Sequence, residues 1–198
     1  MSPTADSTKK KPITIFVVIH DDVPESTRKN LHADYFQPLI SELESFTERK
    51  VYVIFGRLAP YSNFDYKNEN EQITSSRWEN MCVSYLEKRL AEGFIIDRPT
   101  KVLLVTNEDM NNRIAGIARV HPPLFTGISA IASLTGYNYA AHEIGHLLGA
   151  RHEDSEIQYN GWWCETYMTP KPGGITSNCY LFSPANRQNI KNYLASID

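Results

Sequence analysis

The sequence lacks any long hydrophobic run, and its longest apolar stretch is ITIFVVI, at residues 13–19. Because a membrane-spanning helix needs about 20 apolar residues, we expect no insertion into a membrane. Residues 1–12 are polar and have no apolar core of the kind that signal peptides carry. We interpret them as a flexible lead-in at the start of a processed or excised domain.

An excess of either charge is also missing, since the formal net charge is −3 over 198 residues. Proteins that bind nucleic acid or anionic membranes electrostatically usually carry a strong positive charge, so we expect neither partner. The hydrophobic and charged fractions, 41% and 22%, are ordinary for a soluble globular protein. No internal repeat is visible, and the length predicts one domain, which we expect to act as a monomer.

Cysteine is scarce, with three residues in the chain. Cys82 lies on the apolar stripe of a predicted helix, where we expect a buried free thiol. Cys164 and Cys179 bracket a loop rich in proline and glycine, which suits a disulfide. Closing a loop of this length would stabilise the fold by about 3 kcal/mol in an oxidising compartment. The expected location is extracellular, either as a secreted protein or as an exported effector domain.

Hydrophobic patterns alternate between strands and helices along the first half of the chain. This alternation is typical of an α/β fold with a twisted, mostly parallel sheet. Pro38 interrupts the first long helix and predicts a kink or a break there. The predicted elements of this region are strands at 13–19, 51–56 and 101–107 and helices at 26–47 and 76–90.

The second half begins with a shorter predicted strand at 114–120, at the edge of the sheet, which the segment HPPLFTG ends. A helix is expected from about 134 to 148, followed by an irregular, loop-rich stretch. A final helix is expected to begin at Ser183, with Pro184 in its first position, and to run to about residue 197.

The segment AHEIGHLLGARHE, residues 141–153, holds three of the six histidines of the chain. Residues four apart lie on one helix face, so His142 and His146 point the same way and their ring nitrogens can share one ion. Zinc binds imidazole nitrogen in tetrahedral geometry, so these two ligands would fill half of its shell. Glu143 is rotated by about 100° from His142, which predicts a place beside the metal rather than on it.

Gly149 follows these residues, and glycine commonly ends helices because it adopts a left-handed conformation without penalty. A sharp turn there can bring His152 back as a third ligand, whereas a continued helix would carry it about three turns from His142. Regular structure gives way to irregular chain at this point. We therefore expect a cleft between an upper part, residues 13–149, and a lower part, residues 150–198, of one catalytic domain.

Three neutral imidazoles would leave the fourth zinc position open for water, which is the arrangement of a catalytic site. Zinc lowers the pKa of such a water to about 7, and Glu143 would take its proton as a general base. Two alternatives stay open. The chain could be a binding module that keeps the fold without catalysis, or Cys164 or Cys179 could complete a structural zinc site.

HEIGHLLGARH, followed by a methionine in a turn, resembles the metzincin clan of zinc peptidases. In that clan the methionine forms a hydrophobic floor beneath the three histidines, a role that the resemblance gives to Met168. The order and spacing of the elements look most like the reprolysin or adamalysin group over nearly the whole chain. Glu153 departs from that group, which usually has Asp after the third histidine, and looks like the astacins. The resemblance implies a zinc endopeptidase that acts on proteins or peptides.

The implied fold would hold the substrate along the predicted edge strand. An extended peptide can pair with such a strand, and the expected contacts are Gly116, Ile117 and Ala118. The glycine and the alanine are small enough to allow close approach. The loop at 169–174, with Pro170, would wall the pocket on the leaving side of the scissile bond. In the resembled family this pocket takes hydrophobic side chains.

The expected cofactor is one zinc ion, with calcium as a weaker second candidate. Asp21 and Asp22 follow the first strand and could bind calcium. Carboxylates exposed to solvent at a strand end are the simpler explanation, and the sequence does not decide between the two.

Overall fold

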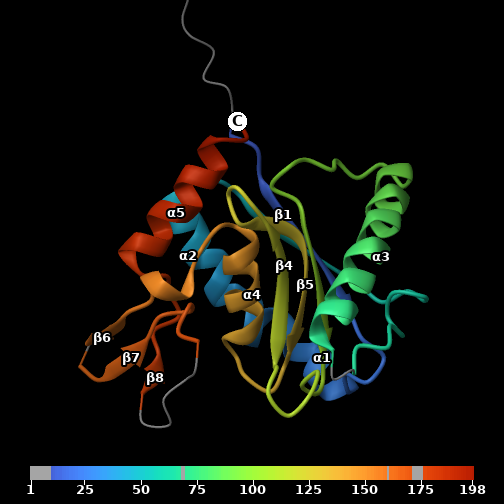
Figure 1. Ribbon diagram of the computed structural model, residues 1–198, viewed down its shortest axis with the longest axis horizontal. Helices are drawn as coiled ribbons and strands as arrows, with labels where there is room; N and C mark the ends of the chain where they lie inside the picture. The colour runs from blue at the N-terminus through green and yellow to red at the C-terminus, as the bar shows by residue number, and fades with distance from the viewer. Residues whose placement is uncertain (1–9, 68–69, 160, 171–175) are drawn as a thin grey trace, which may run out of the picture.

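A five-stranded sheet forms the centre of the protein (Figure 1), and its strand order is β2-β1-β3-β5-β4. All neighbouring strands are parallel except β4, which is antiparallel to β5. This arrangement confirms the predicted α/β class and the mostly parallel sheet. The strands are β1 (Ile13–Ile19), β2 (Val51–Gly56), β3 (Lys101–Thr106), β4 (Gly116–His121) and β5 (Thr126–Ser133). The computed structural model describes residues 10–67, 70–159, 161–170 and 176–198.

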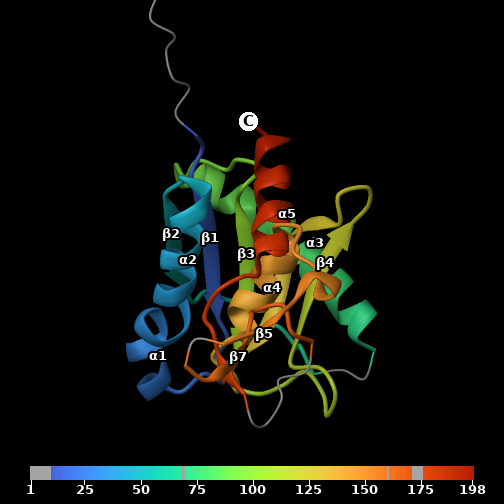
Figure 2. The ribbon, with the colours of Figure 1, turned by 90° about the vertical axis from the view of Figure 1, so that its left-hand side faces the viewer.

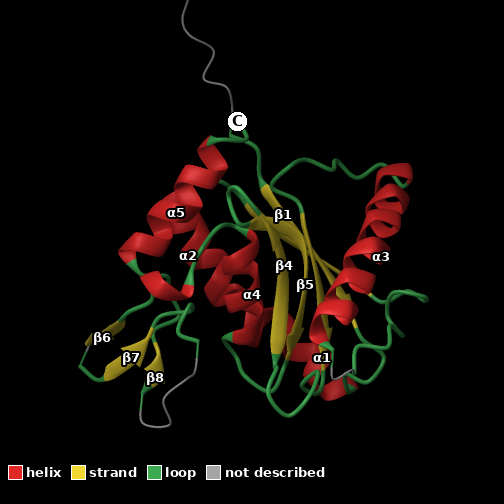
Figure 3. Cartoon of the chain, viewed as in Figure 1, coloured by secondary structure: helices red, strands yellow, loops and turns green. Residues whose placement is uncertain are grey.

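Helices cover both faces of this sheet (Figures 1 and 3). One face packs against α1 (Glu25–Leu31), α2 (Gln37–Thr47), α4 (Tyr139–Leu147) and α5 (Pro184–Ala195). The other face packs against α3 (Glu71–Ala91). Figure 2, turned by a quarter, shows α4 and α5 in front of the sheet and α3 behind it.

Strand β1 shows why the apolar runs become strands. Ile15 and Val17 face the core on the α2 and α4 side, whereas Phe16 and Val18 face the core under α3. A parallel strand that is buried on both faces reads as a continuous hydrophobic run instead of an alternating pattern. The stretch ITIFVVI therefore fits the middle of the sheet.

The break predicted near Pro38 is present. The segment His32–Phe36 is π-helical and separates α1 from α2, and Pro38 lies in the first turn of α2. Proline is tolerated in a first turn because the N–H that it lacks has no helical partner there. The long predicted helix is thus two helices with a bulge between them.

Two predicted helix starts are wrong by about five residues. The helix that carries His142 begins at Tyr139 and not near residue 134, because the preceding residues 126–133 form the unpredicted strand β5. Helix α3 begins at Glu71 and not near residue 76, because the Asn70 side chain accepts a hydrogen bond from the Ile73 N–H and caps the extra turn.

The loop-rich lower region contains a small second sheet that the sequence did not predict. Its strands are β6 (Ile157–Tyr159), β7 (Trp163–Glu165) and β8 (Ser177–Asn178). The predicted disulfide between Cys164 and Cys179 is present, with an S–S distance of 2.04 Å. Cys82 is a buried free cysteine, as expected.

Two sequence predictions lie partly outside the described residues. These are the lead-in, of which residues 1–9 are not described, and the cleft-wall loop, of which residues 171–174 are not described. Among the helices that the structure does describe, none has the length and apolar character needed to cross a bilayer.

Candidate active site

The apolar residues of helix α4 pack into the core, which leaves its histidines together on another face. Ile144 and Leu147 are fully buried under the sheet. His142 and His146 lie one turn apart on a shared face, and their ring centroids are 4.8 Å apart.

The helix ends as the glycine predicts. Gly149 has a φ of +94°, a conformation that residues with a side chain rarely adopt. The Ala150 N–H donates to the Gly145 carbonyl at 2.9 Å, a hydrogen bond that closes the helix and turns the chain back. His152 then begins a short 3-10 turn, His152–Asp154, that faces α4.

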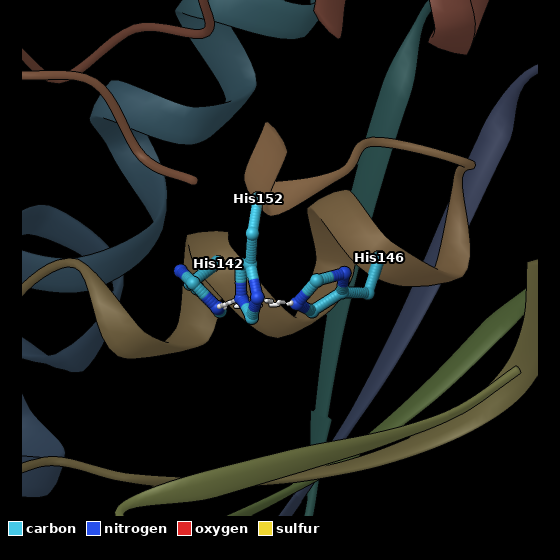
Figure 4. A group of neighbouring side chains, drawn as sticks. All are labelled: His142, His146 and His152. Atoms are coloured by element: carbon cyan, nitrogen blue, oxygen red, sulfur yellow. Dashed lines mark hydrogen bonds between the residues drawn. The ribbon is translucent and has the colours of Figure 1, made fainter. Parts of the chain in front are cut away.

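The three imidazole rings converge on one point (Figure 4). The Nε2 atom of His142 lies 3.2 Å from that of His146 and 2.9 Å from that of His152. The Nε2 atoms of His146 and His152 are 3.0 Å apart. Tetrahedral zinc with bonds of about 2.0–2.1 Å would separate its ligand atoms by about 3.3 Å, so this spacing fits one shared ion.

Protons on the opposite ring nitrogens make these atoms suitable as ligands. His142 Nδ1 lies 2.7 Å from the Tyr167 carbonyl oxygen, and His146 Nδ1 lies 3.1 Å from the Ala150 carbonyl oxygen. A carbonyl oxygen can only accept, so each Nδ1 carries the proton and each Nε2 is left with a free lone pair. Two such lone pairs cannot form a hydrogen bond with each other because neither atom carries a proton, whereas one cation can bind them together.

Burial keeps these two rings neutral. Desolvation, together with the nearby imidazoles, lowers the pKa of His142 to about 3 and that of His146 to about 4. A neutral imidazole is the form that binds a metal ion. The donor set therefore fits zinc in both spacing and charge.

Glu143 lies beside the histidines with only 6% of its surface exposed. Burial raises the pKa of its carboxyl group to about 8. A cation held by the neighbouring imidazoles would favour the ionised form of this carboxyl group. The arrangement places a buried carboxyl group next to three histidines that could bind a metal ion.

Met168 is fully buried and packs directly against helix α4. A Cβ atom at Gly145 would lie 2.6 Å from the Met168 sulfur and 2.7 Å from Cε1 of Phe182. The absence of a side chain at Gly145 thus lets the methionine approach the helix between the two histidine turns. The role of Met168 as a floor beneath the histidines stays a prediction.

A residue that the sequence analysis missed holds the segment before His152. The Asn186 side chain, fully buried at the start of α5, accepts a hydrogen bond from the Arg151 N–H at 2.6 Å and donates to the Arg151 carbonyl at 3.0 Å. Arg151 is thereby kept extended just before the third histidine. Nothing in the spacing of residues 151 and 186 signals this contact.

A cleft of about 500 Å³ opens over the three histidines and Glu143. Its upper wall is β4 and its lower wall includes Thr169. The four residues predicted to contact the substrate, which are Gly116, Ile117, Ala118 and Pro170, all line it.

The acidic residues considered for calcium lie elsewhere and have protein partners. The Asp21 carboxylate pairs with Arg57, at 2.8 Å from its Nε. The Asp22 carboxylate accepts hydrogen bonds from the Tyr66 hydroxyl and the Asn107 N–H. Within the described part of the chain, the three histidines are the group of potential ligands that converges on one point.

Cys164 and Cys179 do not join the histidine cluster. Their sulfur atoms are bonded to each other, so neither is a free thiolate for a fourth metal ligand. This geometry argues against the alternative of a structural zinc site completed by a cysteine.

Comparison with models of known protein families found no match. Comparison with curated proteins found none either. Solved structures do match. Metalloproteinase-II from Bacteroides fragilis is similar over 96% of this chain, with a TM-score of 0.67 and 15% sequence identity. A chain in a chaperone-substrate complex is similar over 96% of this chain, with a TM-score of 0.55 and 16% identity.

The chain spans 55% of the length of that metalloproteinase and 34% of the length of the second structure. A zinc-dependent peptidase from Methanocorpusculum labreanum, with 18% identity, aligns with 89% of this chain and 99% of its own at a TM-score of 0.48, which is too low to bear on the fold. The chain therefore shares its fold with the Bacteroides fragilis metalloproteinase and brings together three histidines that could bind a metal ion.

Proposed function

We propose that this chain is a zinc-dependent endopeptidase in which Glu143 acts as the general base. The observation that carries the proposal is the convergence of the three Nε2 atoms, within 3.2 Å of one another, beside a buried carboxyl group. The similarity of the fold to a bacterial metalloproteinase is consistent with it. The finer assignment to the reprolysin group is part of the proposal and rests on the order of the elements.

His142, His146 and His152 would hold the zinc ion through their Nε2 atoms. A bound zinc ion would activate a water molecule and polarise the carbonyl group of the scissile bond. The Tyr167 and Ala150 carbonyls keep the protons of two of the rings on Nδ1, so those rings stay neutral and fixed in orientation. Met168 would support these rings from below.

Glu143 would move the proton that hydrolysis requires. Its carboxylate would accept a proton from the attacking water and pass it to the amine of the leaving peptide. The burial that raises its pKa favours the first of these two transfers, because a more basic carboxylate accepts the proton of the water more readily. The same group thus serves as base and then as acid.

A protein or peptide substrate would bind along β4. This strand lies at the edge of the sheet, so its outer backbone groups are available to an extended chain. Gly116, Ile117 and Ala118 would make these contacts, and Pro170 would wall the pocket for the residue after the scissile bond. We extend to this pocket the hydrophobic preference that the metzincin resemblance implies.

We further propose that residues 13–198 form one catalytic domain, with residues 1–12 as a lead-in, and that the protein acts as a monomer outside the cytosol. The disulfide between Cys164 and Cys179 supports an oxidising compartment, where such bonds persist. Zinc is the single cofactor in this proposal.

Cleavage of a peptide library, with and without a chelator, tests the proposal. We expect cleavage that the chelator abolishes and added zinc restores. Replacement of Glu143 by alanine should leave zinc binding and the fold intact and lower kcat by at least about 10²–10⁴-fold, the usual contribution of a general base. Glu87→Ala, at an exposed position of α3, is the matched control and should cleave like the parent protein.

The outcomes separate the proposed peptidase from a binding module. A parent protein that binds zinc but cleaves nothing in the library would favour the module. Cleavage that is insensitive to the chelator, or an active Glu143→Ala variant, would show that the proposed chemistry is wrong.

A further inference from the structure

Glu143 reaches across from α4 to the first residue of the edge strand. A Cβ atom placed on Gly116 would lie 2.6 Å from Oε1 and 2.9 Å from Cγ of Glu143. Cβ atoms essentially never approach other heavy atoms this closely. The carboxyl group of Glu143 therefore occupies the space that a side chain at residue 116 would need.

The strand at this point has little freedom to withdraw. Gly116 is paired with Ala132 of β5, and the Ser133 N–H donates to the Ala115 carbonyl at 2.8 Å. Strand β5 is in turn held between β3 and β4 and buried on both faces of the sheet. If residue 116 carried a side chain, the strand would therefore stay in place and Glu143 would have to move.

The carboxyl group of Glu143 is less firmly held than the strand. Among the described residues, no hydrogen bond or ion pair restrains the Glu143 carboxyl group, and it lines the cleft. Contact with the bare backbone of Gly116 is thus the restraint that limits how far the carboxyl group can swing toward the strand.

We propose that Gly116 is a positioning residue, whose lack of a side chain sets where the Glu143 carboxylate rests relative to the three histidines. This inference rests on the proposed function, because it matters for catalysis only if Glu143 is the general base. It also gives Gly116 a role distinct from the close approach of the substrate that the sequence suggested.

A stability cycle tests the contact without any need for activity. Gly116→Ala should lower the melting temperature of the parent protein, because the methyl group meets the carboxyl group. The same change in a Glu143→Ala background should have no such effect, because the opposing group is gone. Gly56→Ala is the matched control, since a Cβ atom there would meet its nearest neighbour, the Tyr85 hydroxyl, at an ordinary 3.5 Å.

A kinetic experiment tests the consequence. Displacement of a catalytic group by about 1 Å can cost roughly 100-fold in rate, so Gly116→Ala should lower kcat by about that factor. KM and zinc affinity should stay at the parent values, because neither the backbone edge of β4 nor the histidines change. Binding of a substrate peptide to the zinc-loaded Glu143→Ala protein should be the same with and without Gly116→Ala.

Each failure has its own signature. An additive stability cycle, an unchanged kcat, or peptide binding that Gly116→Ala weakens in the Glu143→Ala background would overturn the role of Gly116 while leaving an active parent peptidase. A parent protein that cleaves no peptide would overturn the proposed function, and the catalytic role of Gly116 with it.

Discussion

Lys101 begins β3 with a side chain that is fully buried. Its Nζ donates hydrogen bonds to the Gly127 carbonyl at 2.7 Å and to the Tyr193 hydroxyl at 2.9 Å. No carboxylate of the described residues pairs with it, and burial lowers its pKa to about 7. Both hydrogen bonds can also be made by a neutral amine, so the two contacts do not oppose that shift.

The lowered pKa of Lys101 makes the free energy of unfolding depend on pH. The pKa of lysine in an unfolded chain is about 10.4, so between about pH 7 and pH 10 the unfolded chain binds a proton that the folded chain does not. The free energy of unfolding should therefore rise with pH across this window and stop changing, for this group, below about pH 7. Denaturant unfolding at pH 7 and pH 9 should show a gain of about 2 kcal/mol from Lys101.

Lys101→Met removes the titrating group and should remove this gain, whatever its effect on absolute stability. Lys88→Met, at an exposed position of α3, should leave the pH dependence of the parent unchanged. An equal rise in stability with pH for the parent and Lys101→Met would contradict the assignment.

At the same scale, spacing alone identifies some residues of the site and cannot identify others. His142 and His146 follow from the helix period, and His152 follows from the turn that Gly149 allows. Their supporting partners do not follow, because a backbone carbonyl such as that of Tyr167 is present at every residue and carries no sequence signal. The contact between Glu143 and Gly116 joins two elements whose relative placement only the folded chain defines.

At the scale of elements, helix α5 holds the segment that carries the third histidine. Asn186 exchanges two hydrogen bonds with the backbone of Arg151. In addition, the Ser183 hydroxyl donates to the Asp154 carbonyl, and Asn189 Nδ2 donates to the Asp154 carboxylate at 2.7 Å. The start of α5 thus fixes the backbone on both sides of His152.

We expect Asn186→Ala to weaken zinc binding by roughly 10–100-fold, the usual cost of losing a group that orients a metal ligand. The free energy of unfolding of the zinc-free protein should fall by about 1–3 kcal/mol, because two backbone groups lose buried partners. Chelator competition and denaturant unfolding measure the two effects separately. Asn192→Ala, at an exposed position of the same helix, is the control, and equal zinc affinities in the two variants would contradict this role of α5.

Elements with strong hydrophobic patterns were predictable, and elements made of small residues were not. Strands β1 and β2 coincide with their predicted ranges, and β3 is one residue shorter than predicted. Strand β5 was not predicted because its sequence, TGISAIAS, has few of the β-branched or aromatic residues that are typical of strands. Ala130 and Ala132 are fully buried against the α4 side of the sheet, so packing by that helix, which is a tertiary effect, favours small residues there.

At the scale of the whole molecule, the proposed ion would join two regions of the chain. His142 and His146 belong to a helix that packs on the main sheet, whereas His152 belongs to the segment that α5 holds. An ion that binds only the folded arrangement stabilises it in proportion to its affinity, by about 4 kcal/mol at a free concentration 1,000 times its Kd.

Saturating zinc should accordingly raise the melting temperature of the metal-free protein by roughly 10 °C, as expected for a domain of this size. The shift should largely vanish in His152→Ala, and calcium at the same concentration should not reproduce it. Differential scanning calorimetry measures these shifts directly. An equal response of the parent and His152→Ala to zinc would place the ion elsewhere.

The general architecture was predictable because a parallel sheet with helices on both faces follows from the alternation of patterns. The lower region was not, because its second sheet consists of strands of two or three residues, too short to show any periodicity. The disulfide compensates for this sparse regular structure by linking β7 to the residue that follows β8.

That bond also closes a covalent ring around the segment that carries Met168 and Pro170. A single cut anywhere between residues 165 and 178, including one that the protein makes in itself, would leave the two fragments tethered. Such nicked molecules would migrate as one intact chain on a non-reducing gel and separate into two pieces only after a thiol reductant is added.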